Sequence, residues 1–139
     1  MTKEEEITRN LTLIEYYKEE LNAIEVQIQY MQAAIADFHK AKLTVQQIQN
    51  AEINSEILIP IGGGTFLNGV LKDKSKILVD IGAGLITEKT GEGAVKKIDE
   101  RIKNLQDNYN KLMSIAQKIE NDANELSQKT QQMMDSSQE

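Results

Sequence analysis

Apolar residues recur at intervals of three and four in the first and last parts of the chain. Residues 1–52 contain no glycine or proline, and residues 94–139 have the same character. A sustained period of about 3.5 residues is typical of a coiled-coil seam, so the spacing predicts two long helices. The stripe on the first consists of Ile7, Ile14, Tyr17, Leu21, Ile24, Ile28, Met31, Ile35, Phe38 and Val45, and on the second of Ile98, Ile102, Leu105, Tyr109, Leu112, Ala116, Ile119, Ala123, Leu126, Thr130 and Met133.

The two stripes match in length, and a chain reversal between them would bring them together as an antiparallel pair. In one alignment, Ile14 lies opposite Met133, and apolar residues then meet along the whole seam. A shift of one heptad preserves the pattern equally well, so the register stays open. The alternative is that each helix pairs with another chain. The turns between the stripes favour pairing within one chain.

Residues 53–93 contain all eight glycines, the only proline and most β-branched clusters. Four strand-like runs in this part are joined in pairs at glycines, with a polar turn between the pairs. This pattern predicts two β-hairpins, with glycine wherever the backbone turns or bulges. The predicted strands are 56–61, 65–71, 76–81 and 85–89, and the predicted turn glycines are Gly62, Gly63, Gly64, Gly69, Gly82 and Gly84.

Apolar side chains are dense in both predicted hairpins, often on consecutive residues. Strands of this kind need cover on both faces, and two hairpins alone offer little core and leave open edges. We therefore expect oligomerisation through the hairpins. The residues expected to mediate it are Ile57, Leu58, Ile59, Ile61, Phe66, Leu67, Val70, Ile77, Leu78, Val79 and Ile81.

The run of three glycines at 62–64 also raises the question of a phosphate-binding loop. A P-loop requires lysine after its second glycine, but Val70 follows Gly69. A dinucleotide-binding fingerprint beginning at Gly62 requires glycine where the chain has Leu67. The predicted context also differs, because these glycines join strands and do not open a helix whose amides bind an anion. We therefore expect no nucleotide and no other cofactor.

Composition excludes further classes of function. The chain has no cysteine and one histidine, which excludes a thiolate metal site or a histidine cluster. A net charge of −6 argues against a nucleic-acid partner. No apolar run approaches the roughly 18–20 residues that span a membrane, and “MTKEEEI” is no signal peptide, so we expect no membrane partner and a cytoplasmic location. No nucleophile–base pair or carboxylate pair suggests an enzyme.

The whole chain resembles the prefoldin family, and within it the alpha class of archaeal subunits. The resemblance is carried by “ILIPIGGGTFLNG” (57–69) and “KILVDIGAGLITEKT” (76–90) between the two heptad regions. It implies an α+β fold, in which a long antiparallel coiled-coil helical hairpin carries two central β-hairpins that form an oligomeric β-barrel. The implied single domain, 1–139, comprises a helix at 1–52, hairpins at 53–93, a helix at 94–135 and a disordered tail at 136–139.

The resemblance also implies a function. Members of the family are ATP-independent molecular chaperones, which hold unfolded proteins at the far ends of their coiled coils and pass them to a group II chaperonin. Two alpha-class subunits with four beta-class subunits would form a hexamer. A gamma-type relative assembles into filaments, so a structural filament or scaffold subunit is the alternative.

Apolar residues lie near both termini, where this family would bind its unfolded clients. Leu11, Leu13 and Met134 are off the heptad stripe and are expected to face water or a client. Flexible Met and Leu side chains suit a surface that binds many sequences, although frayed helix ends with scattered exposed leucines are the alternative. The expected client-binding residues are Ile7, Leu11, Leu13, Ile14, Leu126, Met133 and Met134.

Overall fold

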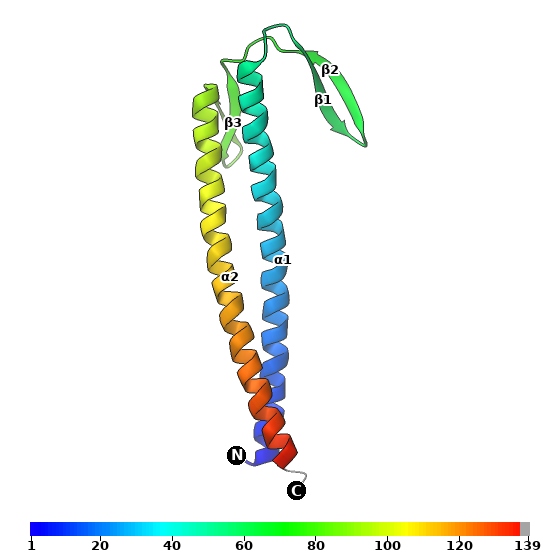
Figure 1. Cartoon of the computed structure of the whole chain (residues 1–139), viewed down its shortest axis with the longest axis vertical. Helices are drawn as coiled ribbons and strands as arrows, with labels where there is room; N and C mark the ends of the chain where they lie inside the picture. Colours follow the sequence, from blue (N-terminus) through cyan, green and yellow to red (C-terminus); the bar gives the residue numbers. More distant parts are fainter. Residues whose placement is uncertain (137–139) are drawn as a thin grey trace. The chain divides into compact units, whose positions relative to one another are not determined.

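The computed structural model describes residues 1–136, which form two long helices and two β-hairpins (Figure 1). These elements confirm the predicted α+β fold class, and the helices and strands begin and end close to the predicted residues. Ser136, assigned to the predicted tail, is the last residue of the second helix, and 137–139 lie outside the described residues. The elements are α1 (Lys3–Asn50), β1 (Glu56–Gly62), β2 (Thr65–Val70), β3 (Ile77–Gly82), β4 (Leu85–Lys89) and α2 (Gly91–Ser136).

The chain divides into two compact units, each containing part of both helices. One contains residues 1–34 and those from 105 onward, and we call it the terminal unit. The other contains residues 35–104, and we call it the hairpin unit. Within each unit a segment of α1 runs antiparallel to a segment of α2, which confirms the predicted pairing of the helices within one chain.

The register of the helix pair differs from the one that placed Ile14 opposite Met133. In the terminal unit, Met133 Sδ instead lies 4.0 Å from Asn10 Nδ2. Gln32 Nε2 donates a hydrogen bond of 3.3 Å to Tyr109 Oη. These contacts differ from the inferred alignment by one heptad. The inferred alignment is therefore wrong, and the helices adopt the alternative register that is shifted by one heptad.

The hairpin unit shows the same shift and a physical reason for it. Lys42 interrupts the apolar stripe of α1, and the inferred alignment would have placed it opposite Leu105. Its Nζ instead forms an ion pair of 2.9 Å with Asp99 Oδ1. Because a charged group within a seam costs free energy unless it finds a partner, this ion pair favours the observed register.

The apolar core of the hairpin unit lies between the ends of the helices that adjoin the hairpins. Val45 of α1 and Ala94 and Ile98 of α2 are buried, and Ala94 has no exposed surface. Ile77 and Val79 of β3 pack against them. The β3–β4 hairpin is therefore fastened to the helix pair by apolar packing.

Arg101 of α2 adds a polar attachment for β3. Its Nη2 donates a hydrogen bond of 2.5 Å to the backbone carbonyl of Asp80. Its guanidinium carbon also lies 5.8 Å from the centre of the Phe38 ring, within the range of a cation–π interaction. Arg101 thus joins α1, α2 and β3 within the hairpin unit.

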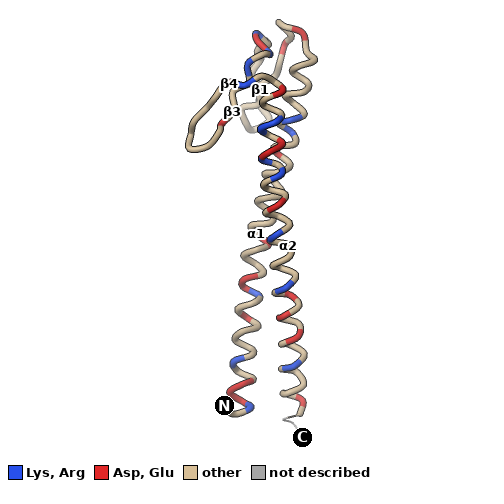
Figure 2. The backbone as a smooth tube through the Cα atoms, turned by 90° about the vertical axis from the view of Figure 1, so that its left-hand side faces the viewer, with Lys and Arg blue, Asp and Glu red and all other residues tan. Residues whose placement is uncertain are grey.

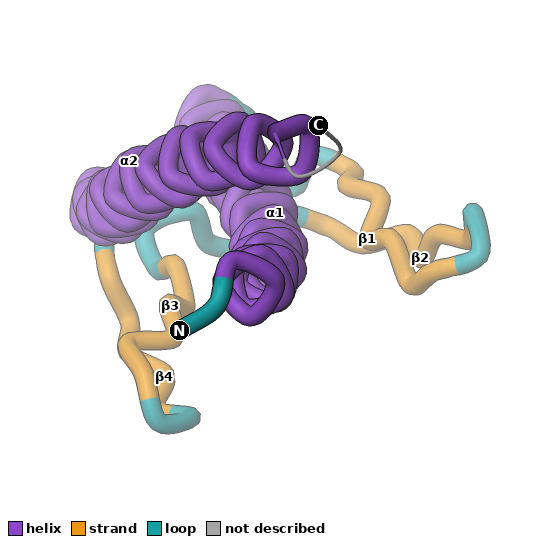
Figure 3. Tube along the Cα trace, turned by 90° about the horizontal axis from the view of Figure 1, so that it is seen from below, coloured by secondary structure: helices purple, strands orange, loops and turns teal. Residues whose placement is uncertain are grey.

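The hairpins are two separate two-stranded antiparallel sheets (Figure 3). The strand register slips between Pro60 and Gly62 in the first and between Asp80 and Gly82 in the second. Gly62 and Gly82 have φ angles of 103° and 115°, a region that glycine adopts readily. The predicted glycine bulges are therefore confirmed. The turn residues with positive φ are Gly63, Gly64, Ala83 and Gly84.

Gly69 was predicted as a turn glycine, and this prediction is wrong. It lies inside β2, opposite Ile57. A Cβ atom at this position would lie 3.1 Å from Ile59 Cδ1 and 3.3 Å from Ile57 Cγ1. The glycine therefore leaves room for two isoleucine side chains of β1 to lie across the neighbouring strand.

The polar connection between β2 and β3 caps the C-terminal end of α1. Lys74 Nζ donates hydrogen bonds of 3.2 and 2.8 Å to the carbonyl oxygens of Gln49 and Ala51. Gln49 Nε2 in turn donates a bond of 2.8 Å to the carbonyl of Lys74. The last carbonyls of a helix lack partners within it and attract positive charge. Because α1 has no basic residue in its own last turn, Lys74 supplies that charge from the connection.

Replacing Lys74 with methionine is expected to lower the free energy of unfolding by about 1–2 kcal/mol, because the charge and both hydrogen bonds are lost. Urea denaturation followed by circular dichroism measures the change. Lys72→Met is the matched control, since Lys72 is exposed in the same connection, and it is expected to change the free energy by about 0.5 kcal/mol or less. Equal losses in both variants would contradict a specific cap.

Candidate functional site

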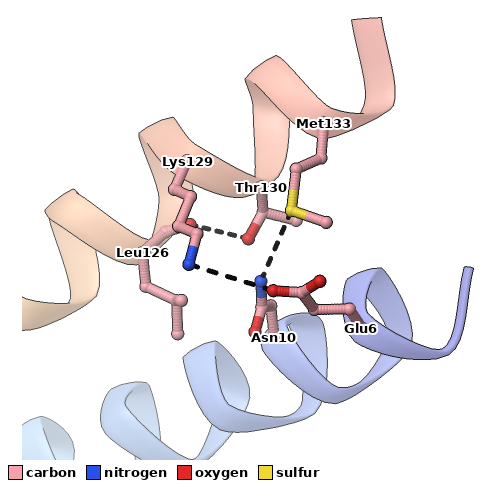
Figure 4. Close-up of polar contacts among 6 residues, drawn as sticks. All are labelled: Glu6, Asn10, Leu126, Lys129, Thr130 and Met133. Atoms are coloured by element: carbon pink, nitrogen blue, oxygen red, sulfur yellow. Dashed lines mark hydrogen bonds and ion pairs between the residues drawn. The ribbon is translucent and has the colours of Figure 1, made fainter. Parts of the chain in front are cut away.

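Two polar residues occupy the seam between the helices near the chain ends, in the terminal unit. Asn10 of α1 and Thr130 of α2 are 5% and 1% exposed, and Figure 4 shows them between the two helices. We call this pair the polar layer. Thr130 was predicted as part of the apolar stripe, whereas Asn10 was not predicted to lie in the seam. The signal was present, because Asn10 falls three residues after Ile7 and four before Ile14, where the heptad pattern requires a seam residue.

The contacts of the polar layer provide little attraction between the helices. Thr130 Oγ1 donates a hydrogen bond of 2.7 Å to the carbonyl of Leu126, which belongs to the same helix. Asn10 Nδ2 reaches across to Met133 Sδ at 4.0 Å (Figure 4). A thioether sulfur is a weak acceptor. A polar layer of this kind stabilises a helix pair less than an apolar one.

Two exposed contacts join the helices nearer to the termini. Lys129 Nζ lies 3.9 Å from Glu6 Oε1, with side chains 64% and 42% exposed. Lys3 Nζ donates a hydrogen bond of 2.6 Å to Ser136 Oγ, also at the surface. Exposed ion pairs contribute about 0–1 kcal/mol. The last turns of the helix pair are therefore held together weakly.

The residues predicted to bind clients lie at different depths in this region. Leu11 and Met134 are exposed, as expected for residues off the stripe. Leu13 was expected to face water or a client; it is half-buried and lines a shallow groove with Tyr17 and Leu126. The members that are half-buried are Ile7, Leu13, Ile14, Leu126 and Met133.

On the β1–β2 hairpin, the residues predicted to mediate oligomerisation are mostly exposed. The pairing of Pro60 with Phe66 and of Ile59 with Leu67 places Phe66 and Leu58 on one face and Ile59 and Leu67 on the other. All four side chains are exposed. Both faces of this hairpin are therefore apolar and lack cover from the described part of the chain.

On the β3–β4 hairpin, the two faces differ. Ile77 and Val79 are half-buried against the helices, so the structure gives these two predicted residues a role within the chain. The opposite face carries exposed Leu78 and Ile86. Ile86 is not among the predicted residues, and its place on this face follows from its pairing with Asp80 of β3.

Within residues 1–136, no group of three or more His, Asp or Glu side chains is placed to hold a metal ion. Over the same residues, neither helix contains a stretch long and apolar enough to cross a membrane. Acidic and basic residues are interspersed along both helices (Figure 2). The surfaces that stand out are the weakly held helix ends and the open hairpin faces, and both suit the binding of other proteins.

The chain matches the Prefoldin family, described as “Prefoldin subunit”, over residues 17–135. The prefoldin subunit alpha of Archaeoglobus fulgidus is 26% identical over 128 residues, which cover 92% of this chain and 93% of that protein. The prefoldin subunit alpha of Nitrosopumilus maritimus is 29% identical over 140 residues, with 96% and 92% covered. These relatives match the present chain over nearly its whole length.

Two solved structures are similar to the fold. A chain of the filamentous PFD from Methanocaldococcus jannaschii, determined by cryo-electron microscopy, has a TM-score of 0.61 at 21% identity, covering 87% of this chain and 94% of that one. The crystal structure of the prefoldin beta subunit from Thermococcus strain KS-1 has a TM-score of 0.60 at 20% identity, covering 91% and 90%. At these identities the likeness concerns the fold.

Proposed function

The chain belongs to the prefoldin family, and we propose that it is an alpha-class subunit of an ATP-independent chaperone that captures non-native proteins at the ends of its helix pair. The main support is the gathering of apolar residues near both termini. Leu11 and Met134 are exposed there, and Ile7 and Met133 are half-buried close by. Flexible apolar side chains suit weak binding of many unfolded sequences.

The proposed chaperone assembles through the hairpins. Two copies of this chain and four beta-class subunits form a hexamer, whose strands close into a β-barrel and cover one another's edges. The open apolar faces of β1–β2, with Leu58 and Phe66 on one side and Ile59 and Leu67 on the other, support this assembly. In this proposal the complex works in the cytoplasm and delivers its clients to a group II chaperonin.

A filament or scaffold subunit is the second candidate. The observation that favours it is the similarity of this fold to a chain of the filamentous PFD from Methanocaldococcus jannaschii. The two candidates differ in how the hairpins associate, because a closed interface gives a particle of fixed mass and an open one gives fibres of variable length. The mass of the assembly with and without a beta-class partner separates them.

The chaperone proposal is tested by light scattering from a chemically unfolded protein diluted into buffer without nucleotide. The intact complex with beta-class subunits is expected to suppress aggregation. A complex lacking 1–13 and 133–139 of this chain, and the matching ends of its partners, is expected to need roughly tenfold more protein for the same effect. Equal protection would place the binding surface elsewhere, and no protection by the intact complex would favour the scaffold candidate.

A point variant narrows the test to the exposed residues. Leu11→Ser with Met134→Ser removes one leucine and one methionine from the helix ends. Leu43→Ser with Met113→Ser is the matched control, because these two side chains are also exposed but lie away from the termini. The first pair is expected to weaken protection and the second to leave it unchanged. A loss in the control alone would contradict the proposed site.

A further inference from the structure

We propose that the polar layer of Asn10 and Thr130 sets the point at which the helix pair opens. The segments beyond it separate and offer Ile7 and Met133 to an apolar segment of an unfolded protein, while the seam from Ile14 inward stays closed. The identity of the bound protein rests on the proposed function. The opening itself is a property of this chain and is measured without a client.

The closed helix pair covers part of the apolar surface near the termini. Ile7 and Met133 are half-buried, so their full apolar surface is not available to a client. Both lie on the terminal side of the polar layer in sequence, Ile7 before Asn10 and Met133 after Thr130. Separation of the helices up to the polar layer therefore exposes these two residues and leaves the longer seam intact.

Opening the polar layer costs little free energy. The amide of Asn10 can donate two hydrogen bonds and accept two, yet its contact across the seam is the weak one to Met133 Sδ. Water offers stronger partners to a separated amide, so opening here recovers hydration that burial removed. The next layer inward contains half-buried Ile14 and Leu126. Opening that layer would transfer further apolar surface to water without recovering the hydration of a buried amide, so we expect the separation to end there.

Exposed polar contacts hold the ends of the helix pair. Lys3, Glu6 and Ser136 lie on the terminal side of the polar layer, whereas Lys129 directly precedes Thr130. The ion pair between Glu6 and Lys129 spans 3.9 Å between exposed side chains, and the bond from Lys3 to Ser136 is also exposed. Water and salt compete with both. Regions with few buried apolar contacts open locally at low free energy. The polar layer thus separates an end held by exposed polar contacts from the apolar seam that begins with Ile14 and Leu126.

The separation has a direct readout in hydrogen–deuterium exchange. Helical segments shorter than roughly 12–15 residues are marginal in water when they lack a packing partner. The amides of residues 131–136 are therefore expected to exchange each time the ends separate. In a variant with Asn10→Leu and Thr130→Val the apolar seam continues through this layer. Exchange at 131–136 is then expected to slow by roughly tenfold or more, while exchange at 98–105 stays the same.

A matched control makes the same substitutions at exposed positions. Thr12 Oγ1 donates to the carbonyl of Thr8 at 3.0 Å, the same bond to the preceding turn that Thr130 makes, but Thr12 is exposed. Asn22 is an exposed asparagine of the same helix. Thr12→Val with Asn22→Leu is expected to leave exchange at 131–136 unchanged. The single variant Thr130→Val is nearly isosteric, so it provides a second test in case the double variant misfolds. It is also expected to slow exchange at 131–136.

The outcomes separate this proposal from the function it builds on. Unchanged exchange in the polar-layer variants overturns the proposal. In the aggregation assay, a complex containing the double variant is expected to need several-fold more protein than the unaltered complex for equal protection. Slower exchange with full protection also overturns it, because opening would then be unrelated to capture. If the unaltered complex protects nothing, the proposed function fails, while the exchange result still decides whether the polar layer controls opening.

Discussion

Replacing Leu58 and Phe66 with aspartate is expected to abolish assembly of the chain with its partner subunits while both helices remain formed. The two side chains are exposed on one face of β1–β2. A carboxylate placed in an apolar interface loses its hydration without gaining a partner. Central interface residues each contribute about 2 kcal/mol or more, so the double variant is expected to weaken assembly by roughly a thousandfold.

Light scattering coupled to size-exclusion chromatography measures the mass of the assembly, and circular dichroism measures helix content. The matched control is Val26→Asp with Tyr30→Asp, two exposed apolar residues of α1 outside the hairpins. The control is expected to assemble normally. Normal assembly of the hairpin variant, or loss of assembly in the control alone, would show that the subunits meet through the helices.

Replacing Ile98 with alanine is expected to lower the free energy of unfolding by about 2–4 kcal/mol. Ile98 is buried beside Val45 and Ala94, and Ile77 and Val79 of β3 pack on the same cluster. The substitution removes apolar contacts and leaves a cavity where the hairpin is fastened to the helices. Because few other side chains of the described residues are buried, little surrounding core exists to compensate.

Urea denaturation of the full-length chain measures this loss. Ile115→Ala is the matched control, because it makes the same change in the same helix at a residue that is 49% exposed. The control is expected to change the free energy of unfolding by about 0.5 kcal/mol or less. A similar loss in both variants would mean that the effect arises from the helix and not from the cluster around Ile98.

The elements of the fold were predictable because their signals are local. A heptad stripe without glycine or proline extends over each helix, and such a stripe stabilises a long helix with one apolar seam. Glycine at the end of a strand-like run supplies the positive φ that a bulge or tight turn requires, as at Gly62 and Gly82. The need of the hairpins for cover also followed from their density of apolar residues.

Features that join distant residues were less predictable. Gly69 looked like a turn glycine until pairing placed it opposite Ile57. Lys74 looked like part of an ordinary polar turn, but it caps α1 through the carbonyls of Gln49 and Ala51. Leu13 lies off the stripe, yet it is half-buried. In each case the partner lies on another element, so no local pattern identifies it.

The sequence by itself determined that this chain forms two paired helices and two hairpins, because helix periodicity and glycine turns depend on neighbouring residues. The tertiary structure alone decided which of several equivalent alignments the helices adopt. A heptad repeat is satisfied again after every shift of seven residues, so apolar spacing cannot distinguish the alternatives. The polar exceptions in the seam do distinguish them. Lys42 meets Asp99 and Asn10 lies near Met133 only in the observed register, and these contacts connect residues that are far apart in the sequence.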